Sequence, residues 1–323
     1  MYKFFFLSLV ICNLSFGQKS IDSVTIRSLR KNLTIIASDD MQGRETGTKG
    51  IEKAAKYIEN EFSKIGLTPI RPNKNYRQWY KISGIFKDAF NIIGCIEGKN
   101  KNDEYILISA HYDHLGIEEG QIYNGADDNG SGTAALLSIA EAIMKKKKEG
   151  FEINRNIVFI AFSGEEKGLL GSRYFTNNPI IPFEKISCNI NIDMIGRVDP
   201  DRISADSLNY VHVVGQSKIS SDITPILNEL NSKTQNLVLD SKYDVKDEPN
   251  RLFYRSDHYN FAKNGVPVIF FFDGMLGGDY HDFTDDVDKI NWGLYQKRVN
   301  FILDLTLKIT NKKEMLRRDL KIR

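Results

Sequence analysis

The chain has 323 residues, of which 41% are hydrophobic and 27% are charged, an ordinary composition for a globular protein with a large core. Its 44 Lys and Arg residues nearly balance its 42 Asp and Glu residues. This balance creates no overall field that would favour a nucleic acid or an acidic membrane surface as a partner, so the function must depend on local sites.

The first seventeen residues are typical of a secretory signal peptide. Lys3 precedes a short apolar run, and the small residues Ser15 and Gly17 follow it. We expect cleavage near Gly17 and export to the periplasm or outside the cell. The apolar run is shorter than the roughly 20 residues of a bilayer span, so no stable membrane span is expected after signal removal. A lipoprotein site at Cys12 is the alternative, although the residue before it is not small.

Periodic apolar residues then predict helices and strands in alternation. A helical pattern runs from Ile51 to Ile65 and ends at Gly66, and a second begins at Ser131 and ends in four lysines before Gly150. Short runs rich in Ile, Val and Phe predict buried strands, namely FNIIGCI, YILISA, NIVFIAF and PVIFFF. This alternation predicts an α/β three-layer sandwich, with a mostly parallel twisted sheet and helices on both faces.

No repeat or linker divides the chain, so residues 18–323 are predicted to form a single domain. The segment 197–255 is more polar and less periodic, and we interpret it as an excursion near the active site. Cys95 and Cys188 each lie in an apolar stretch, and the sequence leaves open whether they form a disulfide.

Metal-ligand residue types follow several of the predicted strands. Open α/β sheets bind ligands at the carboxyl ends of their strands, so these positions point to one common site. Imidazole and carboxylate groups without a thiolate suit catalytic zinc. The residues at strand ends are His111, Glu165, Glu166, Asp193, Tyr280 and His281, and Asp127 and Asp128 stand in a loop before a helix.

Two local features suggest different catalytic roles for these residues. An Asp at the junction of a Gly-rich loop and a helix can offer two oxygens to two cations, and we assign this bridging role to Asp127. Glu165 and Glu166 lie between Gly164 and Gly168, which permit an irregular backbone. One glutamate can then bind metal while the other faces the attacking water.

The motifs HYDH, GADDNGSG, SGEE, NIDMIG, SDHYNF and YHDFTDD occur in this order. The set resembles the co-catalytic di-zinc aminopeptidase family, metallopeptidase family twenty-eight, which also contains the peptidase domains of glutamate carboxypeptidases and is related to aminopeptidase Y. The resemblance extends from about Met41 to Lys289. It implies two zinc ions per chain and peptide substrates, with metal-activated water as the nucleophile.

The resemblance also implies roles for individual residues. His111 and Asp193 would hold one zinc, Glu166 and His281 the other, with Asp127 between them and Glu165 as general base. Asp113 would brace His111 from behind, as a carboxylate beside a zinc-bound imidazole does. Tyr280 would stabilise the oxyanion, and Asp128 would orient groups or shape the backbone. His114 and His212 are interpreted as polar surface or loop residues.

Three alternatives stay open at this point. The first is a glutaminyl cyclase, a single-zinc transferase of the same fold, and the second is a binding relative without catalysis. The third is a carboxypeptidase or dipeptidase of the same family. Only residues 67–87 stand where larger relatives carry an insert, which favours the compact aminopeptidases. Side-chain preference and oligomeric state cannot be deduced from the sequence.

Overall fold

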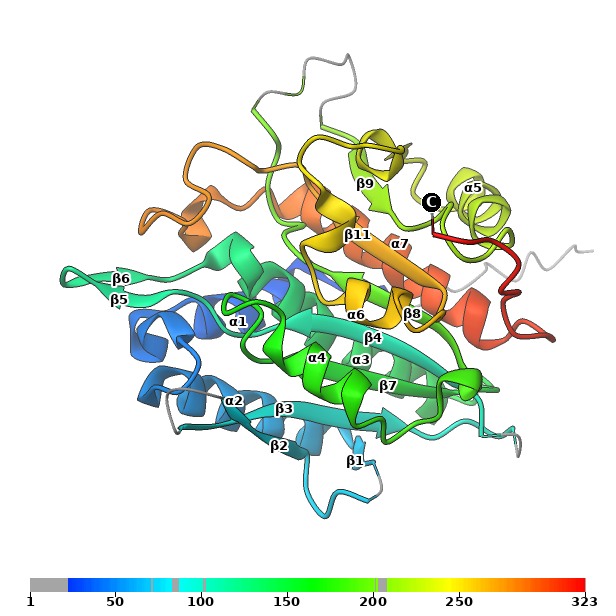
Figure 1. Ribbon diagram of the computed structural model, residues 1–323, viewed down its shortest axis with the longest axis horizontal. Coiled ribbons are helices and arrows are strands. Elements are labelled where there is room, and N and C mark those ends of the chain that lie inside the picture. Colours follow the sequence, from blue (N-terminus) through cyan, green and yellow to red (C-terminus); the bar gives the residue numbers. More distant parts are fainter. Residues whose placement is uncertain are drawn as a thin grey trace, which may run out of the picture.

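The computed structural model of the chain describes residues 23–70, 72–82, 87–100, 103–200, 202 and 208–322 (Figure 1). The predicted signal peptide, residues 1–17, lies outside the described residues. Among the helices of the described part, none has both the length and the hydropathy that crossing a membrane requires.

A twisted sheet forms the centre of the molecule. In the described part of the chain it has nine strands in the order β1-β3-β7-β4-β8-β11-β9-β10, with β2 paired to β3, and β5 and β6 form a separate hairpin. The strands are β1 (Thr68–Pro69), β2 (Arg77–Ile82), β3 (Lys87–Ile96), β4 (Tyr105–His111), β5 (Gly116–Glu118), β6 (Gln121–Tyr123), β7 (Asn156–Phe162), β8 (Ile186–Ile192), β9 (Tyr210–Val214), β10 (Val238–Asp240) and β11 (Val268–Phe272).

The four strands β7, β4, β8 and β11 are mutually parallel and adjacent. They are buried along nearly their whole length, as their continuous apolar runs predict. The strands beside them, β3 and β9, run antiparallel to their neighbours β7 and β11. Parallel pairing brings the carboxyl ends of the four central strands to one edge of the sheet.

Helices cover both faces of the sheet (Figure 1). Helices α1, α2, α3 and α7 form one layer, in which α3 contacts β4, β7 and β8, and α4 and α6 form the layer on the opposite face. The predicted three-layer α/β sandwich is thereby confirmed. The helices are α1 (Ile26–Ile36), α2 (Lys49–Ile65), α3 (Gly132–Lys148), α4 (Leu170–Asn177), α5 (Ile223–Lys233), α6 (His258–Ala262) and α7 (Trp292–Thr310).

The segment 197–255, which was interpreted from the sequence as an excursion, contributes two strands to the sheet. Its strand β9 is fully buried and pairs with β11, and β10 pairs with β9, so the segment extends the sheet at one edge. Cys95 on β3 and Cys188 on β8 are free thiols. Because β7 and β4 lie between their strands, the two backbones are separated by about 14 Å, far beyond disulfide reach.

Candidate metal centre

The carboxyl edge of the central strands brings most of the expected residues together. His111 is the last residue of β4, Asp193 follows β8, and Glu165 and Glu166 follow β7 after a short turn. His281 lies farther along the chain, in the loop after β11. Parallel strand order explains this convergence, because β7, β4, β8 and β11 are neighbours in the sheet.

Two imidazoles each face a pair of carboxylates. His111 Nε2 lies 3.2 Å from Asp193 Oδ1 and 3.4 Å from Asp128 Oδ1. His281 Nε2 lies 3.0 Å from Asp128 Oδ2 and 3.1 Å from Glu166 Oε2. Ligands of a tetrahedral zinc, each 2.0–2.2 Å from the ion, stand about 3.3 Å apart. We call His111, Asp128 and Asp193 the first trio, and His281, Asp128 and Glu166 the second trio. Both have donor types that suit zinc, their imidazole–carboxylate distances lie close to this spacing, and Asp128 belongs to both.

Asp128, and not Asp127, occupies the shared position, which corrects the assignment made from sequence. The backbone at Asp128 is not helical (φ −98°, ψ 98°), so the two neighbouring side chains point to opposite sides. Asp127 Oδ1 accepts a hydrogen bond from the Gly196 N–H at 2.7 Å. Burial and the neighbouring Asp273 carboxylate raise the pKa of Asp127 well above its usual range. Asp127 thus belongs to the support behind the centre.

The loop that carries Asp128 is held by two residues that sequence reasoning missed or left without a role. The Asp285 carboxylate accepts hydrogen bonds from the backbone N–H groups of Asp127 (2.9 Å) and Asp128 (3.0 Å). Burial, followed by the charge of Asp127, raises the pKa of Asp285 to about 7. Asn129 Nδ2 donates to the Ile192 carbonyl at the end of β8 (2.9 Å). These bonds connect the loop to two other segments of the site.

Glu165 lies at the edge of the first trio. Its Oε2 is 4.0 Å from His111 Nε2, and its backbone N–H donates to Asp113 Oδ1 at 3.2 Å. Burial raises the pKa of the Glu165 carboxyl well above its usual range, and the nearby Asp193 and Glu166 carboxylates add to this effect. A carboxyl group with a raised pKa is suited to accept a proton near neutral pH.

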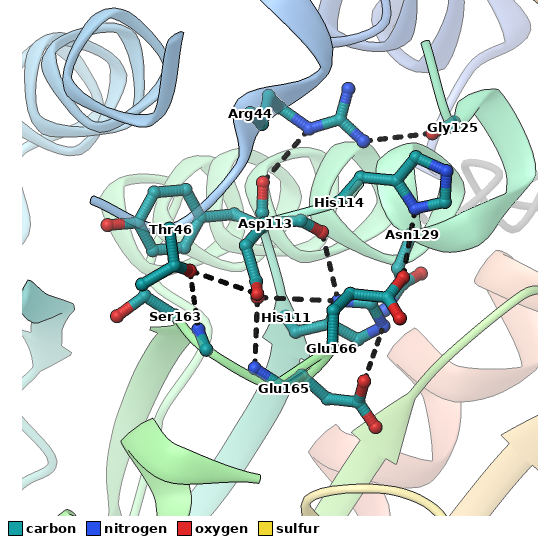
Figure 2. Close-up of polar contacts among 12 residues, drawn as sticks. Arg44, Thr46, His111, Asp113, His114, Gly125, Asn129, Ser163, Glu165 and Glu166 are labelled. Carbon is teal, nitrogen blue, oxygen red and sulfur yellow. Dashed lines mark hydrogen bonds and ion pairs between the residues drawn. The ribbon is translucent and has the colours of Figure 1, made fainter. Parts of the chain in front are cut away.

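Asp113 lies behind His111, where the resemblance placed it, but the contact differs. His111 Nδ1 is 3.1 Å from the Asp113 backbone carbonyl and 3.7 Å from its carboxylate (Figure 2). The carboxylate instead accepts a hydrogen bond from the Thr46 hydroxyl at 3.0 Å, and this hydroxyl accepts one from the Gly164 N–H at 2.9 Å. Asp113 therefore connects the β4 loop to the turn that carries Glu165.

Arg44 is a further residue that the sequence analysis did not identify. It is fully buried, and it donates to the carbonyls of Tyr112 (2.9 Å), Ile36 (2.8 Å), Asn124 (2.6 Å) and Gly125 (2.9 Å), the last shown in Figure 2. Burial lowers its pKa to about 10. The guanidinium fastens the HYDH loop to the loop before Asp128. A single arginine in a polar loop carries no sequence signal for this role.

Tyr280 and Ser256 complete the surroundings of the trios. The Tyr280 ring stacks on His281 at 4.0 Å, and its hydroxyl oxygen accepts a hydrogen bond from Arg255 Nη2 at 3.2 Å. The Ser256 hydroxyl donates to Asp193 Oδ2 at 2.6 Å, which leaves Oδ1 facing His111. A cavity opens beside these groups, and its apolar wall is formed by Met194, Leu252, Phe270, Phe272 and Leu276.

Two histidines that were interpreted from the sequence as polar surface or loop residues are buried. His212 is buried on β9, where it packs against Tyr243 at a centroid distance of 4.6 Å. His114 is buried at the centre itself, with Nδ1 2.9 Å from Glu166 Oε1. Ligating atoms of His114, Asp128 and Glu166 lie within 4.8 Å of one another. The apolar run YVHVV around His212 indicates a buried strand, whereas no pattern around His114 indicates its burial.

The chain is similar in sequence to several known proteins. The chain is 26% identical to leupeptin-inactivating enzyme 1 of Streptomyces exfoliatus over 269 residues, covering 83% of this chain and 52% of that protein. It is 38% identical to a probable glutamate carboxypeptidase, LAMP1, of Arabidopsis thaliana over 231 residues, covering 65% of this chain and 30% of that protein. The chain spans about half the length of the first of these relatives and less of the second.

Solved structures share the fold. A zinc aminopeptidase from Bacillus subtilis superimposes with a TM-score of 0.68 at 17% identity, covering 92% of this chain and 99% of that one. Glutaminyl cyclase from Porphyromonas gingivalis superimposes with a TM-score of 0.69 at 18% identity, covering 88% and 98%. The sequence profile described as peptidase family M28 matches residues 91–306, well over half of the chain. The chain therefore belongs to peptidase family M28.

Proposed function

We propose that this chain is a two-zinc exopeptidase that removes N-terminal residues from peptides. The observation that carries the proposal is the pair of trios joined by Asp128, whose two oxygens each face a different imidazole. A carboxylate shared in this way is the arrangement of two-metal hydrolases. The residues that would hold the ions are His111, Asp193, Asp128, Glu166 and His281.

Bound zinc would polarise the scissile carbonyl and lower the pKa of water at the site. Glu165 would accept the proton of the attacking water and pass it to the leaving amine, because its carboxyl group lies beside the first trio and has a raised pKa. Since the Tyr280 oxygen accepts from Arg255, its own O–H is left free to donate to the oxyanion of the tetrahedral intermediate.

The cavity beside the trios supports an apolar N-terminal residue as the preferred substrate. Phe270, Phe272 and Leu276 contribute to its wall, and the carboxylates of Glu165 and Asp193 line the same cavity. An N-terminal ammonium group would be attracted by these carboxylates while its side chain packs against the apolar wall. A relative of 28% identity over 253 residues is named a probable leucine aminopeptidase, which agrees with this preference.

The likeness to glutaminyl cyclase makes that activity the main competitor. The fold alone does not separate the two, because both structures superimpose about equally well on this chain. The second trio favours the peptidase, since a single-zinc enzyme needs no carboxylate shared between two ions. Cyclisation of a Gln-peptide together with about one zinc per chain would overturn the proposed function.

Glu165→Gln is the direct test of the mechanism. The amide keeps the size of the side chain, and none of the five proposed ligands is changed, so the zinc content should stay at two per chain. We expect kcat to fall by about 10² to 10⁴, the usual contribution of a general base. Peptides blocked at either end, assayed with the unchanged enzyme, establish whether the free N-terminus is required. Near wild-type turnover in the variant would exclude Glu165 as the base.

We further propose that the protein is exported, on the basis of the apolar run and small residues within positions 1–17. Expression of the full chain in a bacterial host should yield a secreted or periplasmic product whose N-terminus lies near Gln18. Retention of Met1 on a cytoplasmic product would contradict the export proposal and leave the enzymatic proposal unaffected.

A further inference from the structure

His114 is a buried histidine at the metal centre to which the peptidase mechanism gives no task. It stands three residues after His111 in the loop that follows β4. Its Nδ1 lies 2.9 Å from Glu166 Oε1 (Figure 2). Because a carboxylate oxygen of Glu166 can only accept, the proton of this hydrogen bond belongs to the His114 ring.

The Glu166 carboxylate is shared between two imidazoles, one for each oxygen. Oε2 lies 3.1 Å from His281 Nε2, and Oε1 is the oxygen that faces His114. Of the two imidazoles, His281 is the nearer to the shared carboxylate: its Nε2 lies 3.0 Å from Asp128 Oδ2, whereas His114 Nδ1 lies 4.0 Å from the same oxygen. His114 thus lies behind Glu166, outside the trio that would hold the ion.

The ring of His114 is held in place on several sides. A Cβ added at Gly125 would stand 2.4 Å from His114 Cδ2, so only glycine allows the loop to lie this close to the ring. The His114 backbone N–H donates to the Arg44 carbonyl at 3.3 Å. The His281 ring meets it edge-on, with centroids 5.9 Å apart. Nε2 has no hydrogen-bond partner among the described residues, so Nδ1 is the nitrogen through which the ring acts.

We propose that His114 is a positioning residue that holds Glu166 Oε1 and thereby presents Oε2 to the second zinc. This inference rests on the two-zinc function proposed above and adds a determinant of the affinity of one site. Ser256 is its counterpart on the other side, because its hydroxyl holds Asp193 Oδ2 while Oδ1 faces His111. Removal of such a hydrogen bond typically weakens metal binding 10- to 100-fold.

The test compares His114→Leu with His114→Asn. Leucine fills a similar volume without a donor, whereas the asparagine amide can place an N–H where Nδ1 stands. Zinc-loaded proteins are titrated with a chromophoric chelator, which resolves the two zinc equivalents by their affinities, and circular dichroism checks the fold. Ser256→Ala is the matched control, since it removes the equivalent hydrogen bond beside His111.

We expect His114→Leu to weaken one zinc equivalent by about 10- to 100-fold and to leave the other within about threefold. His114→Asn should restore most of the affinity, and Ser256→Ala should weaken the other equivalent. Unchanged affinity in His114→Leu, equal weakening of both equivalents, or loss at the equivalent that Ser256→Ala affects would each overturn the inference. A wild-type chain with one zinc would instead overturn the two-zinc function.

Discussion

Asp128→Asn would change a single oxygen of the carboxylate that both trios share. Oδ1 lies 3.4 Å from His111 Nε2, and Oδ2 lies 3.0 Å from His281 Nε2. An amide keeps one oxygen and replaces the other by NH₂, which cannot bind a cation. One of the two sites therefore loses a ligand, whichever way the amide is oriented.

The size of the effect follows from this loss. A catalytic metal ion contributes several kcal/mol of transition-state stabilisation, and each 1.36 kcal/mol corresponds to a factor of ten in rate. We expect the zinc content of Asp128→Asn to fall from two to about one per chain, and kcat/KM to fall by about 10³.

Asp127→Asn is the matched control, because it makes the same chemical change one residue away. The amide oxygen can still accept from the Gly196 N–H, as Asp127 Oδ1 does at 2.7 Å. The new NH₂ would lie beside the Asp273 carboxylate, where two acidic groups now compete. We expect two zinc ions per chain and kcat/KM within about tenfold of the unchanged enzyme.

Atomic absorption gives the zinc content of each purified variant, and hydrolysis of leucine p-nitroanilide gives kcat/KM. The shared role of Asp128 is refuted if Asp127→Asn loses zinc while Asp128→Asn keeps both ions. It is equally refuted if both variants retain full activity, since the shared carboxylate would then have no role.

Four more variants test other parts of the structure. Tyr280→Phe keeps the ring on His281 but removes the hydroxyl, so kcat should fall by about 10² with unchanged zinc content, and an unaffected kcat would exclude the hydroxyl from oxyanion binding. Gly125→Ala, at a φ of +52°, adds a Cβ 2.2 Å from the Asp128 carbonyl oxygen and 2.4 Å from His114 Cδ2, so urea denaturation should show a loss of about 2 kcal/mol and the zinc affinity should fall. Gly150→Ala, at φ +95° with no atom within 4 Å of the added Cβ, should lose less stability and no zinc affinity. Burial lowers the pKa of His258 to about 3. Its contribution to stability is therefore complete above the unfolded pKa of about 6.5 and is lost progressively as the pH falls from there to about 3. Between pH 6 and 5 the free energy of unfolding should fall by about 1 kcal/mol more in the unchanged protein than in His258→Phe, and equal slopes would contradict the buried neutral imidazole.

Much of the fold and of the site could be predicted because the relevant signals are local. Continuous apolar runs mark β4, β7, β8 and β11 as buried strands, and parallel pairing places their carboxyl ends together. His111, Glu166 and Asp193 were therefore recognisable as neighbours from their positions after strands. The order of the motifs then identified the family.

Helix α7 is an element that the local pattern of apolar residues does not reveal. It was not predicted, although it spans Trp292–Thr310, because it is buried on most sides and so lacks the single apolar face that distinguishes a surface helix. Arg44 escaped prediction for a related reason, since its partners are backbone carbonyls from three separate segments.

The choice between Asp127 and Asp128 depended on the tertiary structure alone. Both have the same side chain, and the direction in which each points depends on an irregular backbone. Two distant residues hold that backbone: the Asp285 carboxylate, which accepts from the Asp128 N–H, and the Ile192 carbonyl, which accepts from Asn129. His114 is a similar case, because its burial follows from contacts with Gly125 and Glu166. The sequence by itself determined which residue types reach the edge of the sheet. Which atoms face the metal centre depended on packing between segments far apart in the chain, and no local pattern encodes that packing.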